Sequence, residues 1–338
     1  MDMRFDRSVS DALMAMLETG AGGSLVELAR GQGDEPFFDL QLRSEPKGTA
    51  SWATLYYGMT ALLNLRERRG SFQLTAHRSY MDLASFDPAW TDWQPREVIE
   101  SAWPDVEVYL TAVIDHVDGG AALRKEGLVH AAIASGGSDA YRVIQREARP
   151  SFSDKATRER RLADWIAPFN ETLALIDVGE RWWPGQVRVG TSVDFLAVDI
   201  GGRLALIEAK SDAASAGEIA KVAVQAGMYA AMFADLLREQ PRVTVQAIER
   251  MLAQRTALGL SRPGVLHLRE QGQVVPVVAI GPGRPSPEVH RRMWQVTHAV
   301  AAVGGPRVDP MEVWYLDRTG RITEVERWAD AEGTAQLR

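Results

Sequence analysis

Acidic and basic side chains stand inside two apolar, strand-like runs of the sequence, on either side of a glycine turn. Asp194 lies in the run Ser192–Asp199, and Glu208 and Lys210 close the returning run that begins at Arg203. Side chains alternate along a strand, so Glu208 and Lys210 point to the same face. Carboxylates among apolar side chains are costly unless a partner compensates their charge, and a divalent cation is such a partner. The spacing therefore points to a site that holds a cation.

The turn between the two runs decides whether the two acids meet. If Ile200-Gly201-Gly202 forms a three-residue loop, Asp194 lies directly opposite Glu208 and two carboxylates share one face. A two-residue loop would set Asp194 opposite Ala209 and separate the acids, because a slip of one residue moves a side chain to the other face. The sequence alone leaves both registers open.

The elements around this hairpin are expected to form an α/β unit over residues 150–338. A helix capped by Ser153 or Asp154 precedes the hairpin, and a long helix from Ala216 to Leu237 follows it. Further helices are expected near 245–258 and 287–303, and further strands at 274–280, 312–316 and 321–325. This order predicts a mixed sheet flanked by helices.

Residues 1–149 are expected to form a separate N-terminal α+β domain for recognition or partner binding. Strand-like runs occur at 36–43, 50–57, 59–66 and 71–77, and helical runs occur at 9–17, 96–117 and 121–134. The polar segment from Arg66 to Gly70 ends in glycine and predicts a β-hairpin, whose Arg66, Arg68 and Arg69 are candidates for contacting substrate or partner. The aromatic residues of this domain favour core packing over a binding surface: they include Trp52, Tyr56, Tyr57, Trp90, Trp93 and Trp103.

The hairpin and the helix after it resemble the PD-(D/E)XK nucleases. Asp194 stands for the first acid and Glu208-Ala209-Lys210 for the E-x-K element, while Val193 replaces the proline that usually precedes the acid. Gln225 and Tyr229 resemble the Q-x-x-x-Y element of one branch of that superfamily, and their spacing places both side chains on one helix face.

Upstream, Glu159 occupies a place where many members of the superfamily carry a glutamate that reaches the site, although a surface acid among arginines is the competing interpretation. The nearest likeness of the hairpin is to the nuclease domain of NucS-type DNA endonucleases. The resemblance covers residues 155–233 and leaves the rest of the chain outside it.

The resemblance implies a restriction-endonuclease-like core and a metal-dependent phosphodiesterase, with endonuclease favoured over exonuclease and DNA favoured as the nucleic acid. Asp194, Glu208 and the carbonyl of Ala209 would bind Mg²⁺ or Mn²⁺, which prefer hard oxygen ligands. Lys210 would orient or help deprotonate the attacking water. The other candidates have supporting roles: Gln225 and Tyr229 would position Lys210 or the phosphate, and Glu159 would favour a second metal.

Charge gives a second indication about the partner. The net charge of −7 argues against coating of nucleic acid by the whole surface but permits a local basic groove. Arginines are concentrated between residues 142 and 161, and Arg158, Arg160 and Arg161 are the candidates for substrate binding. Trp182-Trp183 could stack bases, although core packing or loop anchoring is favoured.

Other patterns exclude whole classes of site. The absence of cysteine eliminates disulfides, thiol nucleophiles and Cys-ligated metal centres. No phosphate-loop motif occurs, and His290 and His298 would lie about 12 Å apart along one helix, too far to share a metal. No apolar run of about 20 residues occurs, so no membrane contact is expected and a cytoplasmic location is the default.

A competing hypothesis is a catalytically silent nuclease-like subunit that binds nucleic acid or assembles with a protein partner or a second copy. Repair, restriction and anti-phage defence all use this superfamily, and the sequence does not choose among them.

Overall fold

The computed structural model describes residues 3–31, 38–46, 48–82, 86–118, 126–135, 139–175, 190, 192–262, 268, 273–300, 303 and 308–328. Two compact units make up the chain. The C-terminal unit comprises residues 1–5, 138–246 and 265–338, and the N-terminal unit comprises residues 6–137 and 247–264. The chain therefore passes between the units near residue 138, where the sequence suggested 149/150, and the segment 247–264 returns to the N-terminal unit.

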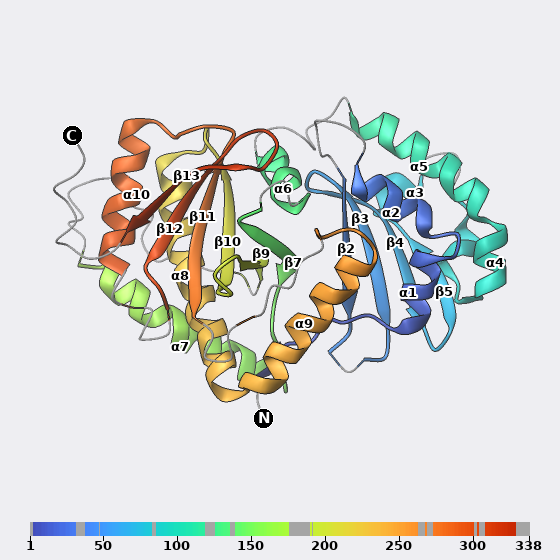
Figure 1. Ribbon diagram of the computed structural model, residues 1–338, viewed down its shortest axis with the longest axis horizontal. Coiled ribbons are helices and arrows are strands. Elements are labelled where there is room, and N and C mark those ends of the chain that lie inside the picture. The colour runs from blue at the N-terminus through green and yellow to red at the C-terminus, as the bar shows by residue number, and fades with distance from the viewer. Residues whose placement is uncertain are drawn as a thin grey trace. The chain divides into compact units, whose positions relative to one another are not determined.

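The C-terminal unit is built on a six-stranded mixed sheet with the strand order β13-β12-β11-β10-β9-β7 (Figure 1). Strands β7, β9 and β10 pair antiparallel, β10, β11 and β12 pair parallel, and β13 is antiparallel to β12. The expected α/β class is confirmed. The strands are β7 (Tyr141–Ala148), β9 (Val193–Asp199), β10 (Leu204–Ser211), β11 (Val274–Gly281), β12 (Met311–Leu316) and β13 (Ile322–Trp328).

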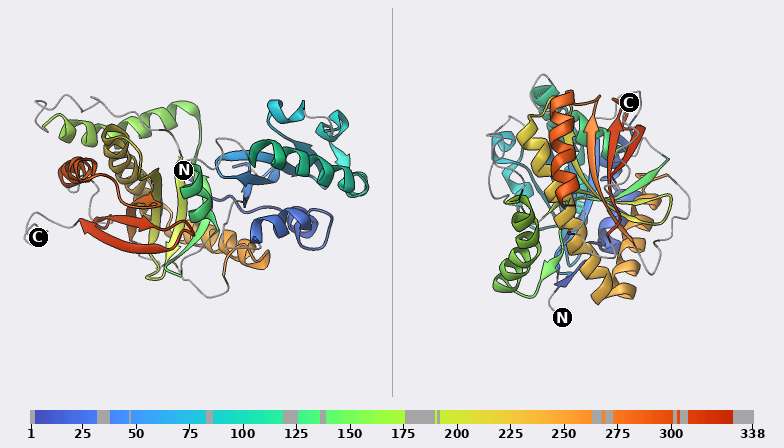
Figure 2. Two further views of the ribbon diagram at one scale, coloured as in Figure 1. Left: turned by 90° about the horizontal axis from the view of Figure 1, so that it is seen from above. Right: turned by 90° about the vertical axis from the view of Figure 1, so that its left-hand side faces the viewer.

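Three helices of this unit lie on one side of the sheet (Figure 2, left). Helix α8 (Ala216–Glu239) packs against β10 and β11, and α7 (Lys155–Leu173) and α10 (Pro287–Val300) pack against α8. Asp154 caps α7, as the sequence suggested, and a capping box of Ser215 and Glu218 fixes the start of α8. The start of α8 is therefore held close behind the end of β10.

Two short strands and one further helix also belong to this part of the chain. The short strand β1 (Met3–Arg4) pairs antiparallel with β8 (Ser151–Phe152). Helix α9 (Pro241–Ala257) begins among residues of the C-terminal unit and ends among residues of the N-terminal unit. Within the described residues, no helix combines the length and the apolarity needed to cross a bilayer.

The N-terminal unit contains an antiparallel sheet with the order β2-β3-β4-β5-β6, and one face of this sheet packs on helices to form an apolar core. The expected α+β character is confirmed. Its strands are β2 (Phe38–Ser44), β3 (Ser51–Tyr57), β4 (Thr60–Arg68), β5 (Ser71–Thr75) and β6 (Gln94–Pro95). Its α-helices are α1 (Asp11–Glu18), α2 (Gly23–Arg30), α3 (Arg78–Met81), α4 (Arg96–Ser101), α5 (Trp103–Asp118) and α6 (Glu126–Ala134), with a 3₁₀ turn at Pro88–Thr91.

The hairpin expected between Arg66 and Gly70 is confirmed. Arg68 pairs with Ser71, which leaves Arg69 and Gly70 as a two-residue turn. Both turn residues have positive φ angles, 53° and 81°, as the tight turns that match the twist of antiparallel strands require.

Candidate active site

The β9–β10 hairpin has the register of a three-residue loop. Leu204 pairs with Val198 and Ile207 pairs with Phe195. One step further along the same register, Asp194 lies opposite Glu208. The register that brings the two acids together, one of the two that the sequence left open, is therefore the one in the structure.

At the end of the hairpin that carries Asp194 and Glu208, hydrogen bonds from backbone N–H groups to side-chain carboxylates take the place of the regular backbone pairing. The backbone N–H of Asp194 donates to Glu208 Oε1 at 3.2 Å, and the backbone N–H of Ala209 donates to Asp194 Oδ2 at 3.0 Å. Regular backbone pairing stops at Phe195 and Ile207, just before these contacts. Each acid therefore accepts a hydrogen bond from the opposite strand, which fixes both carboxylates where the strands part.

The other end of the hairpin is held by a network of ion pairs. Arg203 contacts Asp199 at 2.6 Å, Asp309 at 3.1 Å and Glu312 at 2.9 Å. These carboxylates lie on β9, just before β12 and on β12, so one guanidinium links three segments of the sheet. The network anchors the turn end of the hairpin, and the Asp194–Glu208 pair lies at the other end.

Burial makes the acid pair electrostatically costly. Glu208 is 4% exposed. This burial, and secondly the charge of Asp194, raise the pKa of Glu208 well above its ordinary value, while the hydrogen bond from the Asp194 N–H and the charge of Lys210 act in the opposite direction. A divalent cation between hard carboxylate oxygens would remove most of this cost, so the donor set fits Mg²⁺ or Mn²⁺.

Tyr229 of α8 belongs to the surroundings of the acid pair. Its side chain is buried, and burial together with the charges of Glu208 and Asp194 raises its pKa. Gly190 lies close to its hydroxyl group: a side chain in place of Gly190 would have its Cβ 3.5 Å from the Tyr229 hydroxyl oxygen. Gln225 is half-buried one turn earlier on the same helix. The structure thus places Tyr229 within the electrostatic reach of both acids.

Glu159 does not share this environment. Its side chain is 60% exposed, and its carboxylate lies 3.6 Å from Lys155 one turn earlier on α7. This geometry favours the surface-acid interpretation that the sequence left open.

The three arginines proposed for substrate binding differ in how their charge is used. Arg160 pairs with Asp164 at 3.5 Å along α7, and Arg161 pairs with Glu239 of α8 at 3.0 Å. Among the residues that the structure describes, no carboxylate pairs with Arg158, which is half-buried. Arg161 therefore joins two helices, and Arg158 is the better candidate for an external anion.

The remaining residues named from the sequence lie elsewhere. Trp182-Trp183 falls outside the described residues. On α10, His290 Nε2 lies 2.9 Å from Glu326 Oε2, and the ring of His298 stacks on Trp294 with centroids 5.1 Å apart. The two histidines thus have separate partners within this unit.

The three arginines of the N-terminal hairpin differ in their surroundings. Arg66 lies on the sheet, with its guanidinium carbon 5.8 Å from the Trp52 ring centre and 6.0 Å from that of Trp93, whereas Arg68 and Arg69 are exposed. Most of the aromatic residues expected in the core are buried: Tyr57, Trp90 and Trp103 belong to the apolar core, and Tyr56 is buried outside it. Trp93 differs, with 38% of its surface exposed.

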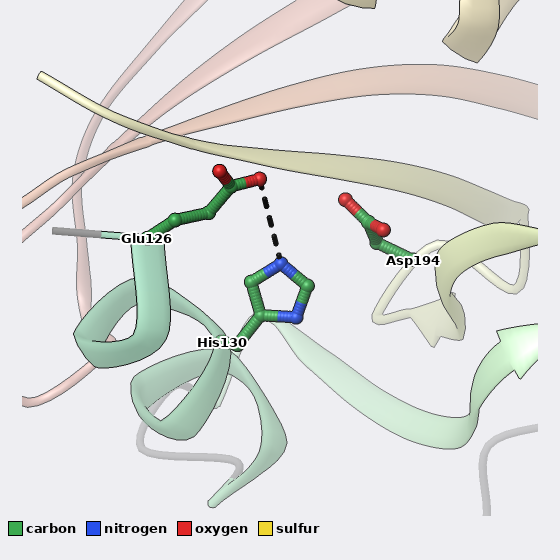
Figure 3. A group of neighbouring side chains, drawn as sticks. All are labelled: Glu126, His130 and Asp194. Atoms are coloured by element: carbon green, nitrogen blue, oxygen red, sulfur yellow. Dashed lines mark ion pairs between the residues drawn. The ribbon is translucent and has the colours of Figure 1, made fainter. Parts of the chain in front are cut away.

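Helix α6 carries a pair that the sequence reading passed over. His130 Nε2 lies 3.9 Å from Glu126 Oε1, one turn away on the same helix (Figure 3). His130 is 3% exposed. The signal available in the sequence was the four-residue spacing of an acid and a histidine within an apolar helix.

No family model, curated protein or solved structure matches this chain.

Proposed function

We propose that the protein is a metal-dependent nuclease that hydrolyses phosphodiester bonds, with DNA as the expected substrate and internal cleavage as the expected mode. The observation that carries the proposal is the pairing of Asp194 with Glu208 at the end of the hairpin away from its turn, with Lys210 on the same strand as Glu208. Helix α7, the antiparallel hairpin β9–β10, helices α8 and α9 and the parallel strand β11 follow one another here, and this order supports a restriction-endonuclease-like core.

Each residue has a role that its position supports. Asp194, Glu208 and the carbonyl of Ala209 would hold Mg²⁺ or Mn²⁺, which supplies Lewis-acid stabilisation of the phosphate charge. The Lys210 ammonium, on the face of Glu208, orients the attacking water and stabilises the negative charge that develops. The phenol of Tyr229 is protonated at neutral pH, and its raised pKa extends this state to more alkaline pH, so it can donate a hydrogen bond to a phosphate oxygen.

One observation favours the catalytically silent alternative. Both acids accept backbone hydrogen bonds, from the N–H groups of Asp194 and Ala209, and these bonds alone would stabilise the parting strands. A structural role of this kind needs no cation. The alternative therefore predicts that the acids matter for folding and not for metal binding or cleavage.

Cleavage assays separate the two. Circular and linear DNA and RNA are incubated with the wild-type protein in Mg²⁺, in Mn²⁺ or in EDTA, beside Asp194→Asn, Glu208→Gln and Lys210→Met. Asp199→Asn is the matched control, because Asp199 is a buried acid on the same strand that pairs with Arg203. We expect metal-dependent nicking that the three site variants lose and the control retains. Equal cleavage by all variants would exclude the assignment.

A further inference from the structure

Strand β7 contains a β-bulge beside the acid pair. Val143 pairs with Ala197 of β9, but Gln145 pairs with Leu196, so Ile144 is an extra residue in the strand. Bulges of this kind redirect the side chains that follow them and are frequent next to active sites.

The bulge decides which face of the sheet receives Gln145. If Ile144 paired in register with Leu196, Gln145 would lie opposite Phe195, and its side chain would point away from the face that carries Asp194. With the bulge, it lies opposite Leu196, which shares a face with Asp194 two residues earlier and, across the hairpin, with Glu208. Gln145 is thereby brought to the face of the acids.

On that face, Gln145 is buried and its amide oxygen lacks a donor. The residue is 2% exposed, and no hydrogen-bond donor within the described structure reaches its Oε1. Its direct cross-strand neighbour, Leu196, is apolar. A buried polar atom without a partner destabilises a fold and calls for an explanation. Because Gln145 shares a face with the two acids, a cation bound there offers that explanation.

We propose that Gln145 is a positioning residue of the Asp194–Glu208 site, and that its amide oxygen accepts a hydrogen bond from the hydration water of the bound divalent cation. A carbonyl oxygen suits such a water because it only accepts hydrogen bonds and adds no charge to a site that already has two acids. The inference rests on the proposed function for the cation, and it adds a neutral, water-mediated contact from a different strand.

The test uses Gln145→Leu, which keeps the size of the side chain and removes its polar atoms. Two quantities are measured on the full chain: the melting temperature in EDTA, and the Kd for Mn²⁺ by calorimetry. We expect the melting temperature to rise, because the unsatisfied group is gone, and the Kd to increase about 10- to 100-fold, as for other residues that support a metal site indirectly. Gln145→Met is a second variant in case the first folds poorly.

Thr297→Val is the matched control. Thr297 of α10 is fully buried, and its hydroxyl has no hydrogen-bond partner among the described residues. This variant should also raise the melting temperature in EDTA, but it should leave the Kd for Mn²⁺ unchanged.

The outcomes distinguish this inference from the function on which it rests. A wild-type Kd that the Gln145 variants preserve overturns the inference and leaves the proposed function intact. A lower melting temperature of both variants in EDTA also overturns it, because Gln145 would then have a structural partner. A wild-type protein without affinity for Mn²⁺ overturns both.

Discussion

Neutralising Glu208 should stabilise the metal-free protein, although it removes a residue of the proposed active site. Glu208→Gln retains the oxygen that accepts the N–H of Asp194, a contact of 3.2 Å in the wild-type protein, and abolishes the charge beside the Asp194 carboxylate. Two unit charges about 4 Å apart repel each other by ~4 kcal/mol at an effective dielectric constant of ~20. The charge of Lys210 offsets part of that cost, so we expect a gain of about 1–3 kcal/mol in the free energy of unfolding, within the range found when buried charges are replaced by neutral groups.

The gain should depend on pH in a defined direction. The pKa of Glu208 is raised in the folded protein, so the protonated carboxyl favours folding. This contribution is fully present below the ordinary pKa of 4.5 and is lost as the pH rises through the folded-state pKa. The difference between Glu208→Gln and the wild type should therefore vanish near pH 4 and should grow as the pH rises above the ordinary pKa of 4.5.

Thermal or urea unfolding in EDTA, measured from pH 4 to pH 8, tests this reasoning. Glu312→Gln is the control, because Glu312 is also buried but contacts Arg203 at 2.9 Å and Arg327 at 3.2 Å. Removing its charge should destabilise the protein, since Arg203 loses a partner. Two results would refute this account, in which burial and the neighbouring Asp194 make the ionised Glu208 costly. One is a Glu208→Gln protein that is less stable than the wild type at pH 7.5, and the other is a stability difference that does not change with pH.

Three further variants test separate parts of the account. Replacing Arg66, Arg68 and Arg69 by Glu should weaken nucleic-acid or partner binding and lower the salt dependence of binding by about 1 per lost phosphate contact, with the Mn²⁺ affinity unchanged; an unaltered salt dependence would remove this hairpin from the recognition surface. Lys210→Met should reduce the single-turnover cleavage rate by at least about 10²-fold and retain the bound metal, and full activity would deny Lys210 a part in the reaction. Tyr229→Phe should leave the melting temperature within about 2 °C and slow cleavage about 10-fold or more, whereas a large loss of stability with normal cleavage would make Tyr229 a core residue only.

The acid pair could be predicted from the sequence because the glycines mark the position of the turn and so restrict how the two strands can pair. Two glycines after Ile200 limit the loop to a few conformations, and in the register of a three-residue loop Asp194 and Glu208 share one face. The choice between the two possible registers does not follow from the local pattern; in the structure the turn end of the hairpin contacts distant residues, as Arg203 does with Asp309 and Glu312.

Strand β7 was not anticipated for a physical reason. Its bulge places both Gln145 and Arg146 in buried positions, so the alternation of apolar and polar residues that identifies a strand is broken. The sequence could not decide whether Glu159 reaches the site or lies on the surface. Helical spacing shows which residues share a face of the helix, but it does not show which face meets the sheet. Tertiary packing decides both matters.

The central claim is that Asp194 and Glu208 form a cation site, and a calorimetric titration of the metal-free protein with Mn²⁺ tests it most directly. The account predicts saturable binding by the wild type and by Asp199→Asn, and a loss of affinity of at least about 10-fold in Asp194→Asn. Equal Mn²⁺ affinity in the wild type and Asp194→Asn, or no binding to the wild type, would contradict it.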